Sequence, residues 1–225
     1  MSEAGPTTAR NTVVAAALDL FAAQGFEATS VEQIAQAVGM SRSTFFRQFG
    51  GKDDVVFSDH DLLLAQLRAV LRDADATAAE NPWATVCAAS VGVFRHFAAE
   101  PELARRRYAV VRQVPTLRER EIVTVFQYER LFDEYLRAAL PGLDPIDAVA
   151  FSAALTAVHN HVLRRLLRGT EDIAESVLTD AYEVLLHRFG VHPDGERTRS
   201  DDVVVAVFPR RMPTAEVARR LRDSL

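Results

Sequence analysis

Glycine and proline divide this chain into segments whose apolar residues repeat with the period of an α-helix. In the first segment Val14, Ala17, Leu18 and Phe21 follow the spacing i, i+3, i+4, i+7, and Gly25 closes it. A glycine at that place is typical of a helix C-terminus, where the backbone turns left-handed. Before residue 200 no stretch alternates between apolar and polar residues as a half-buried strand does, so the chain is predicted to be all-α.

The same signals predict about nine helices joined by short loops. Hydroxyl or amide side chains precede several of them as caps, among them Thr29 (with Glu32 three residues later), Ser41, Asn81 and Thr170. The expected helices span residues 8–24, 31–38, 42–49, 52–75, 82–99, 101–114, 116–140, 145–168 and 171–189.

The composition of the 225 residues excludes several classes of protein. A formal net charge of −5 argues against a nonspecific nucleic-acid coat protein, and the single cysteine, Cys87, excludes a disulfide framework. No apolar run approaches the roughly 18–20 residues of a membrane span, and the N-terminus lacks the form of a signal peptide. His159 and His161 are two residues apart on a helix, on different faces, which argues against a metal site. We therefore expect a cytoplasmic protein with no metal ion, no cofactor and no membrane partner.

Residues 29–49 are the most informative segment. Two short helical patterns are separated by residues 39–41, a turn with the length and the glycine of a helix-turn-helix. Phe45 and Phe49, four residues apart, are predicted to face the core. The other positions of the second helix suit DNA, because arginine pairs with guanine, glutamine with adenine, and hydroxyl groups with phosphate. The candidate DNA contacts on this helix are Arg42, Ser43, Thr44, Phe46, Arg47 and Gln48.

Together these residues resemble the DNA-binding domain of the TetR family of transcriptional regulators. The resemblance continues into residues 52–54 and covers roughly residues 8–57 at the N-terminus of the chain. The spacing before the helix-turn-helix also matches, at Ala16, Leu18, Phe21, Gly25 and Phe26. The resemblance implies a homodimeric, sequence-specific DNA-binding protein with a variable second domain that binds a small molecule.

The resemblance also implies roles for three residues outside the second helix of the motif. Thr29 and Ser30 match the family's phosphate contacts, and Lys52 matches its phosphate-contacting lysine. A helix N-terminus carries partial positive charge, so a lysine beside it suits a phosphate. The family often has tyrosine in place of Phe46 and an aromatic residue or histidine in place of Gln48, which shifts weight to the basic residues.

Charge within residues 1–55 is arranged unevenly. The segment holds four basic and six acidic residues, yet Arg42, Arg47 and Lys52 lie within eleven residues of one another on the proposed DNA face. We therefore expect local attraction of DNA on an otherwise acidic body, with few phosphates neutralised per subunit and a modest dependence of affinity on salt.

Residues 56–190 are rich in aromatic residues, and the resemblance places a small-molecule pocket among their middle helices. Aromatic residues at helical spacing also build ordinary cores, and that alternative stays open for each of them. Apolar rings with a few polar groups suit a hydrophobic ligand. The candidate ligand-binding residues are Trp83, Phe94, Phe97, Tyr108, Phe126 and Phe132.

Residues 101–120 carry a run of arginines that forms either a solvated face or a cationic rim for an anionic head group. These are Arg105, Arg106, Arg107, Arg112, Arg118 and Arg120. The segments 47–49, 105–107 and 114–118 are similar to an actinobacterial subgroup of the family that includes regulators of the mycofactocin gene clusters. Some relatives respond to fatty acyl-coenzyme A thioesters, so the resemblance implies a hydrophobic, acyl-CoA-like effector.

The resemblance assigns the dimer interface to the last two helices, near residues 144–168 and 170–189; packing of both helices within one subunit is the alternative. The first helix carries small residues that allow close approach, namely Ala148, Ala150, Ala153, Ala154 and Ala157. The second carries an apolar stripe of Ile173, Val177, Leu178, Ala181 and Leu185. A two-fold dimer implies a palindromic operator with half-sites about one helical turn, or a multiple of it, apart.

The sequence thus predicts a helix-turn-helix DNA-binding domain at 1–55, a helical ligand-binding and dimerisation domain at 56–190, and a C-terminal extension at 191–225 with a strand-like run at 203–208 and a basic helix at 214–223. The expected function is a ligand-responsive repressor that a small hydrophobic effector releases from DNA. The alternatives are a regulator of the same fold controlled by a protein partner and an all-α enzyme. No nucleophile or acid–base motif favours the enzyme.

Overall fold

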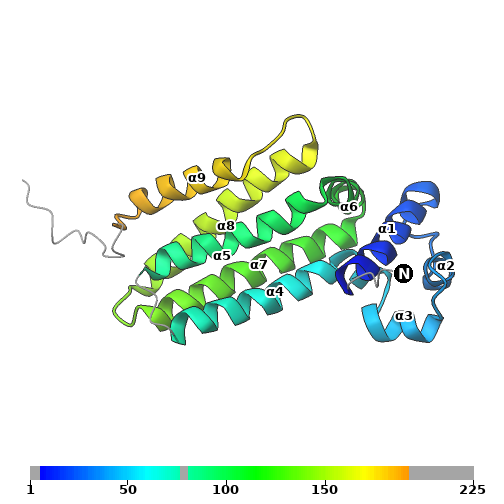
Figure 1. The fold of residues 1–225 in the computed structure, drawn as a ribbon, viewed down its shortest axis with the longest axis horizontal. Helices are drawn as coiled ribbons and strands as arrows, with labels where there is room; N and C mark the ends of the chain where they lie inside the picture. Colours follow the sequence, from blue (N-terminus) through cyan, green and yellow to red (C-terminus); the bar gives the residue numbers. More distant parts are fainter. Residues whose placement is uncertain (1–5, 77–80, 193–225) are drawn as a thin grey trace, which may run out of the picture.

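The computed structural model describes residues 6–76 and 81–192, which fold into nine α-helices (Figure 1). The helices are α1 Pro6–Gln24, α2 Val31–Ala37, α3 Arg42–Phe49, α4 Lys52–Ala76, α5 Pro82–Ala99, α6 Pro101–Gln113, α7 Pro115–Ala139, α8 Pro145–Arg168 and α9 Glu175–Arg188. The all-α prediction is therefore confirmed over these residues. The strand-like run at 203–208 and the helix at 214–223 lie outside the described residues.

Several helix ends lie where the local signals predicted them. The Asn81 side chain accepts a hydrogen bond from the amide of Ala84 at 3.0 Å, and Pro82 occupies the first helical position, where a missing amide hydrogen costs nothing. At its other end α8 stops at Gly169, whose φ of 68° is the left-handed conformation that glycine adopts without strain.

One predicted cap and one predicted helix start are wrong. The cap of α2 is Ser30 rather than Thr29, and its box partner is Gln33: the amide of Gln33 donates to Ser30 Oγ at 3.2 Å, and the amide of Ser30 donates to Gln33 Oε1 at 2.8 Å. Thr29 with Glu32 and Ser30 with Gln33 have the same spacing, so the sequence fits a capping box at either residue. The last helix begins at Glu175, because residues 169–174 are used to reverse the chain between α8 and α9.

The helices form a small head and a longer bundle. Figure 1 shows α1, α2 and α3 grouped at one end of the molecule, while α4, α5, α7, α8 and α9 run lengthwise through the rest and α6 is seen end-on near α1. Among the described helices, α8 is the one that is long and apolar enough to cross a membrane by length and composition alone. It packs against α5, α6, α7 and α9, which makes it a core helix of the bundle.

Two hydrophobic cores meet along α4. The first contains α1, α2, α3 and the first turns of α4, and it also takes Val111 from α6 and Leu117 from α7. The second begins at Leu63 of α4 and continues through α5 and α7 to α9. The head is therefore packed onto the bundle by shared apolar side chains, and α4 belongs to both parts.

Two ion pairs reinforce this junction. Arg106 of α6 forms an ion pair with Asp19 of α1 and donates to the carbonyl of Ala15 at 3.1 Å. Asp54, at the start of α4, pairs with Arg120 of α7 at 2.5 Å. Two of the six arginines predicted as a solvated face or a ligand rim thus join the head to the bundle instead.

A buried ion pair lies between the two cores. Arg107 of α6 donates to Asp59 Oδ2 of α4 at 2.7 Å, and both side chains are more than nine-tenths buried. The His96 ring of α5 lies 3.3 Å from the same oxygen. Burial alone would raise the pKa of Asp59, but the hydrogen bond from His96 and the charge of Arg107 lower that pKa well below its usual range. The carboxylate therefore stays ionised, and the pair ties α4 to α6.

We predict that Asp59→Asn lowers the free energy of unfolding by about 3–5 kcal/mol, because it leaves the Arg107 charge buried without its partner. Chemical denaturation measures this difference. The double variant Asp59→Asn with Arg107→Met removes both charges and should recover part of the loss. Because the folded state lowers the pKa of Asp59, its contribution is complete above the ordinary aspartate pKa of about 3.9 and declines as the pH falls below that value. Equal stability of Asp59→Asn and wild type at pH 7 would contradict the assignment.

Candidate nucleic-acid interface and ligand cavity

The short helix α3 is fixed at its start by a cap and along its length by two rings. Ser41 Oγ accepts a hydrogen bond from the amide of Thr44 at 3.1 Å. Phe45 and Phe49 are buried in the first core, with ring centroids 5.2 Å apart. Because these two rings occupy the inner face, the opposite face of α3 is left open to solvent.

The structure places the predicted contacts of this helix on that open face. Thr44 is half-buried; the exposed members are Arg42, Ser43, Phe46, Arg47 and Gln48. Phe46 is an apolar ring with 41% of its surface exposed, in the middle of a polar face. An exposed ring flanked by arginine and glutamine suits contact with a thymine methyl group.

The two arginines of α3 differ in whether an acidic side chain pairs with them. Arg42 Nε lies 2.8 Å from Glu32 Oε1, and its guanidinium lies 5.4 Å from the centroid of the Phe46 ring. Arg47 is exposed and has no ion pair or hydrogen bond to any side chain that the structure describes. Arg47 is therefore the freer of the two cations, while Arg42 must leave Glu32 to pair with DNA.

Of the two predicted phosphate contacts at α2, only Ser30 is accessible. The Ser30 side chain is partly exposed at the N-terminus of the helix, where unpaired amides favour an anion. Thr29 is 2% exposed, and its hydroxyl donates to the carbonyl of Gly25 at 2.8 Å. The expectation that Thr29 offers its side chain to phosphate is thus corrected: that side chain anchors the turn after α1.

Lys52 has a structural role that the sequence did not reveal. Its ammonium donates to the carbonyl oxygens of Phe26 at 2.8 Å and Thr29 at 3.2 Å, with Glu27 at 3.5 Å. It also lies 4.3 Å from the centroid of the Phe26 ring, a cation–π contact. All three ammonium hydrogens are thereby engaged within the turn between α1 and α2, so contact with a phosphate requires Lys52 to give up one of these bonds.

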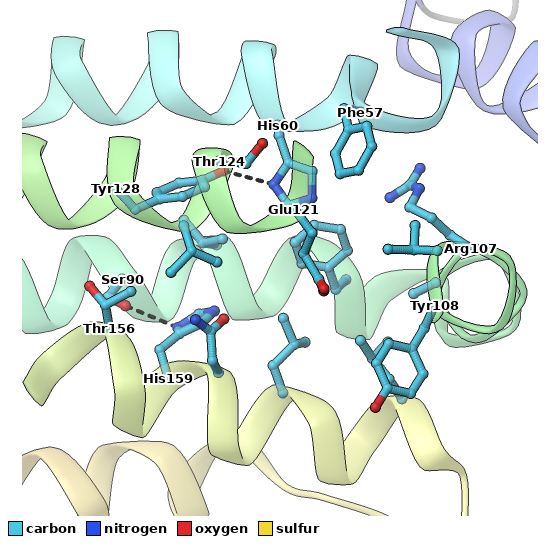
Figure 2. Close-up of a pocket in the computed structure, with 18 of the residues that line it drawn as sticks. Phe57, His60, Ser90, Arg107, Tyr108, Glu121, Thr124, Tyr128, Thr156 and His159 are labelled. Atoms are coloured by element: carbon cyan, nitrogen blue, oxygen red, sulfur yellow. Dashed lines mark hydrogen bonds between the residues drawn. The ribbon is translucent and has the colours of Figure 1, made fainter. Parts of the chain in front are cut away.

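A cavity of about 90 Å³ lies inside the bundle, between α4, α5, α6, α7 and α8 (Figure 2). Aromatic and aliphatic side chains form most of its wall. Besides two tyrosines, polar side chains interrupt the wall on all five helices: His60, Ser90, Arg107, Glu121, Thr124, Thr156, His159 and Asn160. The volume is small beside the roughly 300–1,000 Å³ of typical ligand pockets, so a larger ligand must displace side chains.

Three of the six candidate ligand-binding residues line this cavity. Phe97, Tyr108 and Phe132 line the cavity, whereas Trp83, Phe94 and Phe126 do not. Trp83 and Phe94 are each 1% exposed and belong to the solid core of the bundle. Phe126 is 60% exposed, because α7 turns Thr124, Val125 and Tyr128 toward the cavity and the residue two places after Thr124 points away.

The polar part of the wall was missed by the sequence analysis. His60 Nδ1 lies 3.2 Å from the Tyr128 hydroxyl, and His159 Nδ1 lies 3.0 Å from Ser90 Oγ. Burial lowers the pKa of His60 to about 3 and that of His159 to about 4, so both rings are neutral at pH 7. A signal was available, because His159 occupies an apolar stripe position of α8, four residues after Leu155 and four before Leu163.

An open groove of about 460 Å³ adjoins the cavity and shares Tyr108 and Leu167 with it. Three arginines line the groove: Arg105, Arg112 and Arg168. The Arg112 guanidinium lies 5.5 Å from the Tyr108 ring centroid, and Arg105 pairs with Glu102 at 2.6 Å. The groove is therefore cationic on balance, and Tyr108 stands between it and the cavity.

Comparison with known proteins agrees with the geometry of the head. Residues 13–58 match the sequence family described as bacterial regulatory proteins, tetR family. The chain is 42% identical over 59 residues to the mycofactocin biosynthesis transcriptional regulator MftR of Mycobacterium tuberculosis, covering 26% of this chain and 30% of that protein. It is 49% identical over 49 residues to the HTH-type transcriptional regulator TcmR of Streptomyces glaucescens, covering 22% of each. The chain thus covers less than a third of the length of either relative.

Two solved structures share the whole fold. The SmeT–triclosan complex superposes with a TM-score of 0.59 over 91% of this chain and 99% of that chain, at 17% identity. FadR of Thermus thermophilus in complex with lauroyl-CoA superposes with a TM-score of 0.54 over 88% and 100%, at 21% identity. The head therefore matches the TetR family of bacterial regulatory proteins over residues 13–58, and the two solved structures show that the chain shares their helical fold.

We predict that Lys52→Met lowers the free energy of unfolding by about 1.5–3 kcal/mol even without DNA, because three carbonyl groups lose a charged donor. Chemical denaturation of the DNA-free protein measures the loss. Arg47→Met is the matched control, and we expect it to change stability by less than about 0.5 kcal/mol since Arg47 is exposed and unpaired. If Lys52→Met were as stable as the control, Lys52 would not hold the turn.

Proposed function

We propose that this protein is a sequence-specific DNA-binding transcriptional repressor of the cytoplasm, homodimeric, and released from its operator by a small effector. The observation that carries the proposal is the exposed face of α3, with Arg47 unpaired and presented on a helix that two buried rings hold in place. A rigid helix that offers unpaired arginine and glutamine side chains suits the major groove.

On this proposal the residues of the head have three roles: reading bases, positioning the phosphate backbone and supporting the turn between α1 and α2. Arg42, Arg47 and Gln48 read base edges with Phe46, while Ser30, Ser43 and Thr44 position the phosphate backbone. Thr29 and Lys52 support the turn between α1 and α2, and a direct phosphate contact by Lys52 stays a prediction. Arg42 exchanges its ion pair with Glu32 for DNA on binding.

We propose the outer faces of α8 and α9 as the dimer interface. Ile146, Val149 and Ala157 of α8 are exposed apolar residues, as is Val184 of α9. By contrast, Ala148, Ile173, Leu178 and Leu185 from the predicted interface are buried inside the subunit. The proposed interface therefore keeps the two helices and Ala157 of the predicted set, and it adds Ile146, Val149 and Val184 in place of the buried residues. A dimer of this kind requires a palindromic operator.

For the effector we propose an amphiphile with an anionic group, which lies in the groove of Arg105, Arg112 and Arg168 while its apolar body passes Tyr108 into the cavity. The solved relatives SmeT and FadR hold triclosan and lauroyl-CoA respectively. Since the cavity is only about 90 Å³, such a molecule must widen it. Arg107 lines the cavity and pairs with Asp59, so widening bears directly on the contact between α6 and α4.

Release then follows from coupling between two conformations. An effector that binds only the widened form shifts the protein toward that form by its difference in affinity for the two. Movement of α6 displaces the head, because Arg106 of α6 pairs with Asp19 of α1. Movement of α4 also changes the position of α7 relative to the head, because Asp54 of α4 pairs with Arg120 of α7. DNA binding and effector binding therefore oppose each other.

The Ser90–His159 pair in the cavity does not favour an enzyme. A histidine whose pKa lies near 4 is a poor base at pH 7, so it cannot activate the serine hydroxyl for attack. We propose no catalytic role for these residues.

We predict that Arg47→Ala weakens binding of the dimer to a selected operator by about thirtyfold or more, because a base or phosphate contact worth about 1–3 kcal/mol is lost in each of the two subunits. Fluorescence anisotropy at fixed salt measures the affinity. Arg118→Ala, an exposed arginine on α7, is the matched control and should bind as wild type does. If Arg47→Ala bound the operator with unchanged affinity, the proposal that α3 recognises the DNA sequence would be contradicted.

We also predict that the purified dimer carries or accepts an anionic amphiphile, detected by native mass spectrometry, and that its addition lowers operator affinity. Arg105→Ala with Arg112→Ala should reduce the bound fraction without changing operator affinity in the absence of ligand. Operator binding that no extracted small molecule alters would favour control by a protein partner instead.

A further inference from the structure

We propose that the deep end of the cavity is a subsite for an oxygen acceptor, so that the effector carries a ketone, ester, ether or hydroxyl oxygen on the part that enters furthest, which His159 Nε2 recognises by donating a hydrogen bond. The inference rests on the proposed ligand-binding role of the cavity and narrows the class of effector. A plain hydrocarbon end would leave this donor unpaired.

Three side chains from three helices define the direction of the hydrogen bonds. Tyr182 of α9 has its hydroxyl 2.7 Å from Ser90 Oγ of α5 and 3.3 Å from His159 Nδ1 of α8. Ser90 Oγ lies 3.0 Å from the same Nδ1. Tyrosine and serine each have one proton to donate. Both protons find an acceptor when Tyr182 donates to Ser90 and Ser90 donates to His159 Nδ1.

If the hydrogen bonds ran in the opposite direction, the hydroxyl proton of Tyr182 would have no acceptor. If Nδ1 carried the proton and donated to Ser90, and Ser90 donated to Tyr182, the tyrosine proton would need a further acceptor. No further hydrogen bond joins the Tyr182 hydroxyl to the described residues. A buried hydroxyl without an acceptor is unfavourable, so the first direction holds.

This direction assigns the proton on the histidine ring. Nδ1 accepts from Ser90, and a neutral imidazole that accepts at one nitrogen carries its proton on the other. Nε2 is therefore an N–H donor. It is fully buried without a hydrogen-bond partner among the described residues, and the His159 side chain is 94% buried while lining the cavity.

The surroundings of the donor suit a ligand oxygen. Figure 2 shows His159 and Ser90 at one end of the cavity and Tyr108 with Arg107 at the other. Tyr108 borders the cationic groove, so His159 lies at the end away from the groove. Apolar side chains, among them Phe97 and Phe132, form most of the remaining wall. The site therefore favours an apolar body with a polar group at each end.

Two small probes of the same shape test the subsite in the full-length dimer. Acetophenone carries a carbonyl oxygen where α-methylstyrene carries a methylene group, so the ratio of their dissociation constants reports the hydrogen bond. We expect the preference for acetophenone over α-methylstyrene to fall by about tenfold or more in His159→Leu. In His159→Gln, which keeps an N–H donor, we expect most of the preference to remain. Ligand-observed nuclear magnetic resonance measures both constants.

The proton assignment has its own test. Nitrogen-15 chemical shifts of His159 at pH 7 should show a neutral ring protonated at Nε2, and acetophenone should shift that nitrogen. A ring protonated at Nδ1, failure of both probes to bind, or a probe ratio that is the same in wild type and His159→Leu would each overturn the subsite. None of these measurements involves DNA, so loss of operator binding and loss of the subsite are distinguishable.

Discussion

The ion pair between Asp59 and Arg107 is the contact on which the arrangement of the molecule depends. Burying two charges is costly, and here the cost is offset by a 2.7 Å hydrogen bond and by the nearby His96 ring. The pair joins α4, which both hydrophobic cores share, to α6, which holds α1 through Arg106. Arg107 also lines the cavity. One pair of side chains thus lies next to the proposed effector and next to the junction that sets the position of the head.

Electrostatics divide the molecule in a way that the net charge of −5 does not show. Most arginines of the 101–120 run are engaged: Arg106 and Arg107 with aspartates of the head and α4, and Arg120 with Asp54. Arg105 and Arg112 face a groove, and Arg47 projects from α3. Arginine side chains thus supply positive charge at both surfaces where an anion is expected, a phosphate backbone and an effector head group.

Features that depend on local sequence were predictable, and features that depend on distant partners were not. The inner face of α3 follows from Phe45 and Phe49 alone, and Asn81 with Pro82 is sufficient to start α5. The cap of α2 was misplaced by one residue because Thr29 and Ser30 are both hydroxyls with a suitable partner three places on. The polar wall of the cavity needed tertiary structure, since Ser90, His159 and Tyr182 come from three helices and their hydrogen bonds span up to 92 residues. Phe126 was predicted to face a pocket because it is an aromatic residue of a middle helix, but its side chain is exposed to solvent.

On the proposed function, the exposed face of α3 reads a specific DNA sequence as part of a symmetric dimer. Selection of binding sites from a pool of random DNA duplexes by the full-length protein tests this reading of DNA. We predict enrichment of one palindromic sequence, with two half-sites about one helical turn or a multiple of it apart. Recovery of duplexes with no shared sequence, or of a single asymmetric half-site bound by one subunit, would contradict it.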